Sequence, residues 1–381
     1  MRYAELITES KIHGLTVMSL DQFVKAEGGE QEVDEADGDF GLGANYRKAD
    51  DAEMQDYLGR VKDKAKTKTD PYKMPYVHGS NIAVVDQAGK KYDTSALKRD
   101  ITQRPAKILK QNEKMQHSDG SVSVFFNVGL PALKGLAVNE KTDDFVIVDT
   151  CPGAGACKTF CYALKGSYVM FKAVSMNQTR MLNYLLNDPE GFADQMTAEI
   201  KLAQTQNRGS KIVIRWHDAG DFFSAQYLKM AYDVARDNPK VDFYAYTKMA
   251  DVAQAARPDN FKMNFSSGAQ SSQEKKIDFV KTKHSRVVPK DMFFDLIARK
   301  GNTLIKDAKG RTQFAGQQEL DTFKQRLAQQ FKLDPKTLIT YDQMMSMPEG
   351  DKPLYNVIVM PGDGDDGANR KDILGSYLLF H

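Results

Sequence analysis

Hydrophobic and polar positions along the second half of the chain follow two different periods. Short apolar runs rich in β-branched and aromatic residues, typical of strands, lie at residues 121–127, 145–149, 211–216, 241–246, 261–265 and 286–289. Segments with helical spacing lie between them at 224–237, 250–256 and 274–281, and two further apolar runs follow at 336–341 and 355–360. This alternation predicts an α/β fold with a parallel sheet, either a partial or full (β/α) barrel or an open doubly wound sheet.

Two more helical regions precede the alternating part. Residues 168–205 have the pattern of two helices, separated at Asn187-Asp188-Pro189. Residues 94–110 have the pattern of one helix, in which Pro105 predicts a break because proline removes a backbone donor. Ser224 is the predicted N-cap of the helix at 224–237.

The first 80 residues show little regular patterning. They contain a short amphipathic segment at 1–11, an acidic and glycine-rich stretch at 28–39, and five basic residues between 60 and 68. A small hairpin is expected at 82–92. We therefore expect an irregular N-terminal extension over residues 1–80 and a barrel-like α/β domain over 81–381.

Composition limits the classes of partner. The formal net charge of +2 favours neither nucleic acid nor a membrane surface, and no run of eighteen apolar residues is present. All three cysteines lie within eleven residues, in the segment Cys151-Pro-Gly-Ala-Gly-Ala-Cys157-Lys-Thr-Phe-Cys161. Three clustered thiols indicate metal or cluster ligands in a reducing intracellular setting rather than a disulfide framework.

The spacing of the three cysteines leaves several sites open. A structural zinc site usually takes four ligands in two pairs, and this segment has no second pair. Three thiolates can instead hold an iron–sulfur cluster that keeps one iron open, and the amides of Gly153 and Gly155 could donate to it. Zinc and incidental thiols remain alternatives.

Polar side chains follow several of the predicted strands at the point where each strand ends. They are Arg215, His217, Asp218 and Asp221 around the end of 211–216, Lys248 after 241–246, Ser266 after 261–265, and the segment 361–367 after the last run. Parallel strands place their carboxyl ends at one edge, so these groups are expected to surround one site. Strand alternation places Arg215 and His217 on one face and Trp216 on the other. Capping and hydrogen-bonding roles are the alternative for Asp218, Asp221 and His217, and the acidic segment 363–367 only partly matches a calcium loop.

The cysteine segment resembles that of the radical S-adenosylmethionine superfamily, in which three cysteines follow the first strand of a partial or full barrel. An aromatic residue precedes the third cysteine there, as Phe160 does here. The spacing is x5 and x3 instead of the usual x3 and x2, and the glycine-rich segment that holds the methionine amine is missing. Tyr162-Ala163 and the segment Trp216-His-Asp-Ala-Gly-Asp221 are similar to a family of tailed-phage proteins related to these enzymes.

The resemblance implies a [4Fe–4S] cluster on Cys151, Cys157 and Cys161, with S-adenosylmethionine as the candidate ligand of the open iron. His217, Asp218 and Lys248 would then be the candidate catalytic residues. The candidate cofactor contacts are Phe160, Tyr162, Arg215, Asp221 and Ser266. A radical enzyme would need a reductant and a small-molecule substrate.

Two other classes of function stay open at this point: a non-catalytic cluster protein, for electron transfer or in the virion, and a zinc-stabilised binding protein. Leu6-Ile-Thr-Glu9 resembles a phage head-targeting cleavage pattern. The expected location is the host cytoplasm during infection, with virion association as the alternative.

Overall fold

The computed structural model describes residues 40–49, 94–111, 123–159, 161–164, 168, 172–301, 303–308, 310–350 and 354–379. The amphipathic segment at 1–11, the stretches at 28–39 and 60–68, the predicted hairpin at 82–92, and Phe160 lie outside these residues. Residues 40–49 contain a strand, β1 (Tyr46–Lys48), that pairs with a later strand. This part of the predicted irregular extension therefore belongs to the folded protein.

The larger sheet has nine strands among the described residues, in the order β12-β13-β14-β9-β8-β7-β6-β3-β2. All neighbouring pairs are parallel except β2 with β3, so the prediction of an α/β protein with a mostly parallel sheet is confirmed. The strands are β2 (Lys110–Gln111), β3 (Ser123–Val128), β6 (Lys211–Trp216), β7 (Asp242–Thr247), β8 (Phe261–Ser266), β9 (His284–Val287), β12 (Leu338–Thr340), β13 (Tyr355–Val359) and β14 (Ile373–Leu378).

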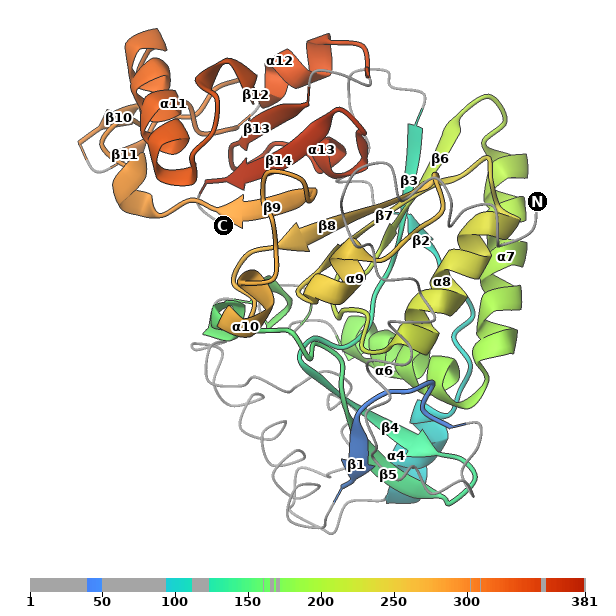
Figure 1. Cartoon of the computed structure of the whole chain (residues 1–381). Helices are drawn as coiled ribbons and strands as arrows, with labels where there is room; N and C mark the ends of the chain where they lie inside the picture. The colour runs from blue at the N-terminus through green and yellow to red at the C-terminus, as the bar shows by residue number, and fades with distance from the viewer. Residues whose placement is uncertain are drawn as a thin grey trace.

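A second, antiparallel sheet has the order β1-β5-β4, with β4 (Lys134–Asn139) and β5 (Asp144–Asp149). Figure 1 shows it at the bottom of the view, on the opposite side of the molecule from β12 and β13. The cysteine segment follows β5, so the expectation that it follows a strand of the parallel sheet is wrong. Thr150 nevertheless connects the chain to segments that follow strands of the parallel sheet. Its hydroxyl donates to the carbonyl of Pro131, after β3, over 2.7 Å, and its carbonyl accepts the amide of Asp221, after β6, over 2.8 Å.

The helices begin where local capping groups are available. Asp188 caps α7 (Pro189–Gln206) by accepting the amide of Gly191, and Pro189 stands in its first turn. Ser224 caps α8 (Ala225–Asp237), as predicted. The other helices are α4 (Thr94–Ile101), α6 (Lys172–Asn187), α9 (Ala250–Gln254), α10 (Ser271–Glu274), α11 (Gln317–Phe331), α12 (Tyr341–Ser346) and α13 (Asp366–Asn369).

Two helix predictions were wrong in their bounds, and three described helices were not predicted. α4 ends at Ile101, before Pro105, and Lys110 belongs to a strand. The helix expected at 274–281 is wrong in position, since the short α10 (Ser271–Glu274) ends where the predicted helix begins; Phe279 instead lies against the guanidinium of Arg286 at 4.1 Å. The helices that were not predicted are the amphipathic α11 and the short α12 and α13.

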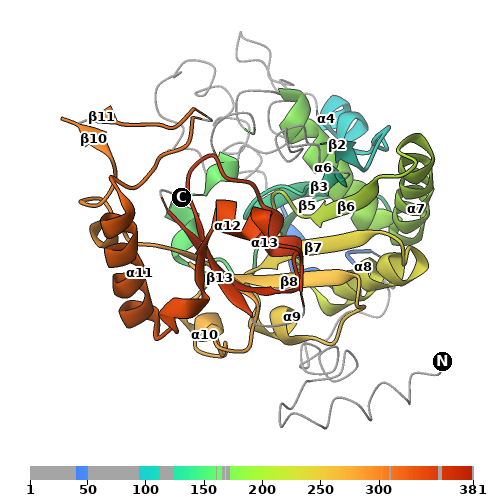
Figure 2. The same cartoon turned by 90° about the horizontal axis from the view of Figure 1, so that it is seen from above.

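The two faces of the parallel sheet bury different groups. Ile214, Trp216 and Phe243 belong to the main core, which also contains most of the buried side chains of α7, α8 and α9. The alternate residues Val213 and Tyr244 pack against Ala368 of α13 on the other face. Figure 2 shows α8 and α9 on one side of β7 and β8 and α13 on the other.

Candidate functional site

A cavity of about 470 Å³ lies at the carboxyl end of the parallel sheet. Its walls come from the cysteine segment, from the ends of β6, β7 and β8, and from the segment that follows β13. It is lined by Cys151, Cys157, Cys161, Tyr162, Arg215, His217, Asp218, Asp221, Lys248 and Ser266. The structure thus brings together every described residue that the sequence singled out for the site, while the role of each stays a prediction.

The backbone of the cysteine segment is hydrogen-bonded to the segment that follows β8. The amides of Gly155 and Cys157 both donate to the carbonyl oxygen of Gly268, over 3.1 and 3.0 Å. The expectation that both glycine amides could face a bound cluster is therefore wrong for Gly155, since its amide already has an acceptor.

The two glycines of this segment allow the close approach. A Cβ on Gly155 would lie 2.2 Å from the carbonyl oxygen of Ala269, and one on Gly153 would lie 2.6 Å from that of Lys248. Real Cβ atoms do not come this near to backbone oxygens. Glycine is therefore required at both positions by packing against the loops after β7 and β8.

The three cysteine side chains share one environment. All of them line the cavity and pack against the same apolar residues, Leu133, Ala154 and Leu164. The sulfur of Cys151 accepts the amide of Leu133 over 3.3 Å. Burial raises the pKa of the Cys151 and Cys161 thiols, because a thiolate loses its hydration there. Across the described residues, no three His, Cys, Asp or Glu side chains converge on a site for a single metal ion.

Arg215 is held by groups from three segments. Its Nη1 donates to Asp365 Oδ2 over 2.8 Å, its Nε to the carbonyl of His217 over 3.2 Å, and its Nη2 to the hydroxyl of Tyr162 over 3.4 Å. Burial alone would lower the pKa of Arg215, but Asp365 and nearby tyrosine hydroxyls hold that pKa well above its usual value. Arg215 is thus a fixed cation at the cavity wall.

His217 is buried and ordered through Tyr227. The hydroxyl of Tyr227 accepts the Nε1–H of Trp216 over 2.9 Å and contacts His217 Nε2 at 2.8 Å. The hydroxyl proton is then free for Nε2, so we assign the neutral tautomer that carries its proton on Nδ1. Burial, together with Arg215, lowers the pKa of His217 to about 3, which keeps the imidazole neutral at physiological pH.

The predicted orientation of His217 was wrong. Strand alternation ends at Trp216, and His217 adopts a left-handed backbone with φ of 71°. As a result His217 and Trp216 both contact Tyr227, instead of pointing to opposite faces.

Asp218 is a mostly enclosed carboxylate beside the end of β3. Its Oδ2 accepts the side-chain amide of Asn127 over 2.7 Å, and its backbone carbonyl accepts the hydroxyl of Tyr162. A Cβ at position 129 would lie 1.8 Å from Oδ1, so Gly129 makes room for this side chain. Burial raises the pKa of Asp218, because a charged carboxylate loses hydration there.

Asp221 joins the ends of β6 and β7. Its two carboxylate oxygens accept the amides of Phe222 and Lys248, each over 2.7 Å. Burial raises the pKa of Asp221 to about 6 despite these bonds. Both oxygens are therefore used by the backbone, which supports the structural alternative for this residue.

Lys248 is fixed by the segment after β8. Its Nζ donates to the hydroxyl and carbonyl of Ser266, over 2.7 and 3.1 Å, and to the carbonyl of Ser267. Burial lowers the pKa of Lys248, and the nearby Cys157 opposes this shift. Lys248 lines the same cavity as the three cysteines.

The acidic segment 363–367 does not form a calcium loop, because its carboxylates have other partners. Asp363 pairs with Arg311, Asp365 with Arg215, and Asp366 accepts the hydroxyl of Tyr341. Sequence reasoning placed this segment at the rim and missed Asp365 as a site residue. The partner of Asp365 is 150 positions away, so no local pattern could have identified the pair.

Fold and site define the class of protein: an α/β protein with a mostly parallel sheet and a cysteine-lined cavity at its carboxyl end. The chain belongs to the Gene product 88 (GP88) family, whose model matches residues 99–328. The match includes the cysteine segment and β6 to β9, and it ends before β12, β13 and β14.

Two curated relatives are the Gene 88 proteins of Mycobacterium phage L5 and Mycobacterium phage D29. They are 32% and 30% identical to the chain over 156 residues, which is 39% of this chain. The chain spans 59% of the length of each relative. These relatives bear out the expected bacteriophage family, and their names state neither a cofactor nor an activity.

No solved structure matches the chain. Among the described helices, none has the length and apolar character needed to cross a membrane.

Proposed function

We propose that the chain is a phage-encoded iron–sulfur protein in which Cys151, Cys157 and Cys161 hold a [4Fe–4S] cluster. The observation that carries the proposal is that all three thiols line one cavity of about 470 Å³, whose other walls present charged and hydrogen-bonding groups. A four-iron cluster with three protein thiolates keeps one iron without a protein ligand, and that position would face the cavity.

The donor set favours a cluster over a single ion. A tetrahedral zinc site needs four ligands that converge at about 2.0–2.3 Å from the metal. In the part of the chain that the structure describes, no such convergence exists, although the three cysteines share one apolar environment. A cluster of several irons takes each thiolate on a different iron, so the three sulfurs need not converge on one ion. The amide of Leu133, already bonded to the sulfur of Cys151, would tune such a cluster.

The proposal includes a radical-SAM-like partial (β/α) barrel. α13 contacts β7 and β8 and also β14, although two strand spacings separate β14 from β8 in the sheet. One helix that touches all three strands supports a sheet curved around it. The cysteine segment then occupies the mouth of this curved sheet, next to the ends of β7 and β8.

A bound cluster would supply an electron and one open coordination position. The side chains around the cavity would supply proton exchange, positive charge and apolar surface. Asp218 is the group suited to proton exchange, and Lys248 supplies a positive charge near the thiolates. Leu378 and Leu379 also line the cavity and would contribute apolar surface to it. S-adenosylmethionine is the ligand that we propose for the open position.

Replacement of one ligand tests the proposal. Cys157→Ala should abolish iron binding during anaerobic purification, whereas Lys158→Ala, at the exposed neighbouring position, should retain it. Equal iron in both variants would refute the ligand assignment. Incubation of the wild type with dithionite and S-adenosylmethionine, with 5′-deoxyadenosine as the measured product, then tests the proposed ligand separately.

A further inference from the structure

The carboxylate of Asp365 occupies a complete anion-binding site. Arg215 Nη1 donates to its Oδ2 over 2.8 Å, and the hydroxyl of Tyr244 donates to the same oxygen over 3.2 Å. The hydroxyl of Tyr246 donates to the other oxygen. One guanidinium and two tyrosine hydroxyls are the kind of donor set that would bind the carboxylate of a ligand. Here the chain itself provides the carboxylate.

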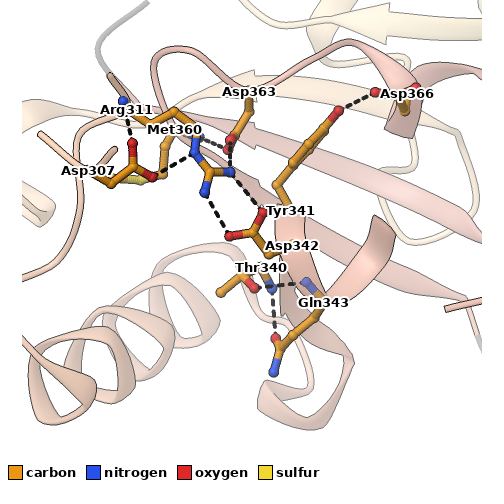
Figure 3. A network of polar contacts seen from close by, with 9 residues as sticks. All are labelled: Asp307, Arg311, Thr340, Tyr341, Asp342, Gln343, Met360, Asp363 and Asp366. Carbon is orange, nitrogen blue, oxygen red and sulfur yellow. Dashed lines mark hydrogen bonds and ion pairs between the residues drawn. The ribbon is translucent and has the colours of Figure 1, made fainter. Parts of the chain in front are cut away.

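The segment that carries Asp365 is anchored on its other side. Arg311 donates to Asp363 over 3.0 Å, to Asp307 over 2.9 Å, and through both terminal nitrogens to Asp342. Figure 3 shows the guanidinium of Arg311 between these three carboxylates. Because Asp363 is only two residues from Asp365, this anchor holds the carboxylate of Asp365 close to Arg215.

We infer that Asp365 is a specificity-determining residue, which blocks anionic ligand groups from Arg215 and limits the cavity at that point to an uncharged group. An anchored intramolecular carboxylate competes at an effective concentration of about a millimolar or more, so a free anion of lower concentration does not displace it. Asp365 lies beyond the part of the chain that the family model matches. This inference deepens the proposed function, since it takes the same cavity as the ligand site.

The inference is tested by chemical rescue with formate, which has the shape and charge of the deleted carboxylate. The thermal midpoint of full-length Asp365→Ala is measured with increasing sodium formate, at constant ionic strength against sodium chloride. We expect formate to bind this variant about tenfold or more tightly than the wild type, as for a charge-assisted bond. The double variant Asp365→Ala with Arg215→Gln should lose that gain. Asp366→Ala, which removes the partner of Tyr341, is the matched control and should gain nothing.

Equal formate binding by wild type and Asp365→Ala would overturn the inference, and so would full rescue of the double variant. If Asp365→Ala does not fold, Asp365→Ser, with a small polar side chain, takes its place with the same expectations. Iron is measured in the same samples. Formate rescue without bound iron would refute the proposed cluster and leave this inference standing. Bound iron without formate rescue would overturn this inference and leave the proposed cluster standing.

Discussion

Substitution of Gly155 tests whether the cysteine segment depends on packing against the sheet. Gly155 does not have a positive φ, so alanine can adopt its backbone conformation. The new Cβ would, however, lie 2.2 Å from the carbonyl oxygen of Ala269, and the segment has to move away. Movement weakens the two bonds to the carbonyl of Gly268, at about 1 kcal/mol each, and overpacking adds about 1–3 kcal/mol. We expect Gly155→Ala to lower the free energy of unfolding by about 3–5 kcal/mol.

The assay combines urea denaturation with the rate at which the thiols of cluster-free protein react with a disulfide reagent. Gly155→Ala should accelerate that reaction, because the cysteines move with the segment. Gly209→Ala is the control: its φ is 88° but its Cβ would meet nothing within 4 Å, so only backbone strain of about 1–2 kcal/mol is expected. Thiol reactivity should stay unchanged in the control. Wild-type stability and thiol reactivity in Gly155→Ala would refute the reasoning.

Three further predictions concern stability. Tyr227→Phe leaves the indole of Trp216 and Nε2 of His217 without their shared partner. Urea denaturation should show a free energy of unfolding lower by about 2–5 kcal/mol, and a decrease under about 1 kcal/mol would contradict the hydrogen-bond assignment. Arg311→Met leaves Asp363, whose side chain is 2% exposed, without a cation and should lower the free energy of unfolding by about 3–5 kcal/mol. Asp342, another partner of Arg311, has a side chain that is 63% exposed, so Asp342→Asn should lower it by under about 1 kcal/mol. Equal losses of stability in the two variants would show that Arg311 does not anchor the segment that carries Asp363. Burial lowers the pKa of His284 to about 4, so the folded state binds fewer protons than the unfolded state between about pH 4 and 6.5. The titration of His284 should therefore lower the free energy of unfolding by about 3 kcal/mol as the pH falls from about 6.5 to 4. His284→Asn should abolish this contribution, and an unchanged pH dependence in the variant would show that His284 does not titrate in this way.

The parts of the fold that could be predicted are those that local patterns determine. β6, β7 and β8 are apolar runs of the right length, and Ser224 is a strong capping residue, so their positions followed from the sequence. The same pattern could not tell which sheet a strand joins. β5 was predicted as a strand, but its antiparallel partners β1 and β4 were not: β1 lies about 100 residues earlier in the chain, whereas β4 precedes β5 in a local hairpin.

α11 shows a signal that was present and overlooked. Leu320, Phe323, Leu327 and Phe331 recur at three- and four-residue spacing, and they pack in one core cluster. Attention to helical spacing after residue 316 would have found this helix.

The ends of the predicted strands indicated which residues gather at the candidate site, but not how their side chains are oriented. His217 lay at the expected edge, but its orientation depends on a left-handed backbone that no strand pattern indicates. The pair of Arg215 and Asp365 depends on β14 and β13 returning to the sheet, so it required the structure.

Metal and sulfide analysis of the full-length protein, purified without oxygen, tests the central claim most directly. The account predicts a brown protein with about four iron and four sulfide per chain, bound through three cysteines. A colourless protein with one zinc per chain and no iron would contradict it.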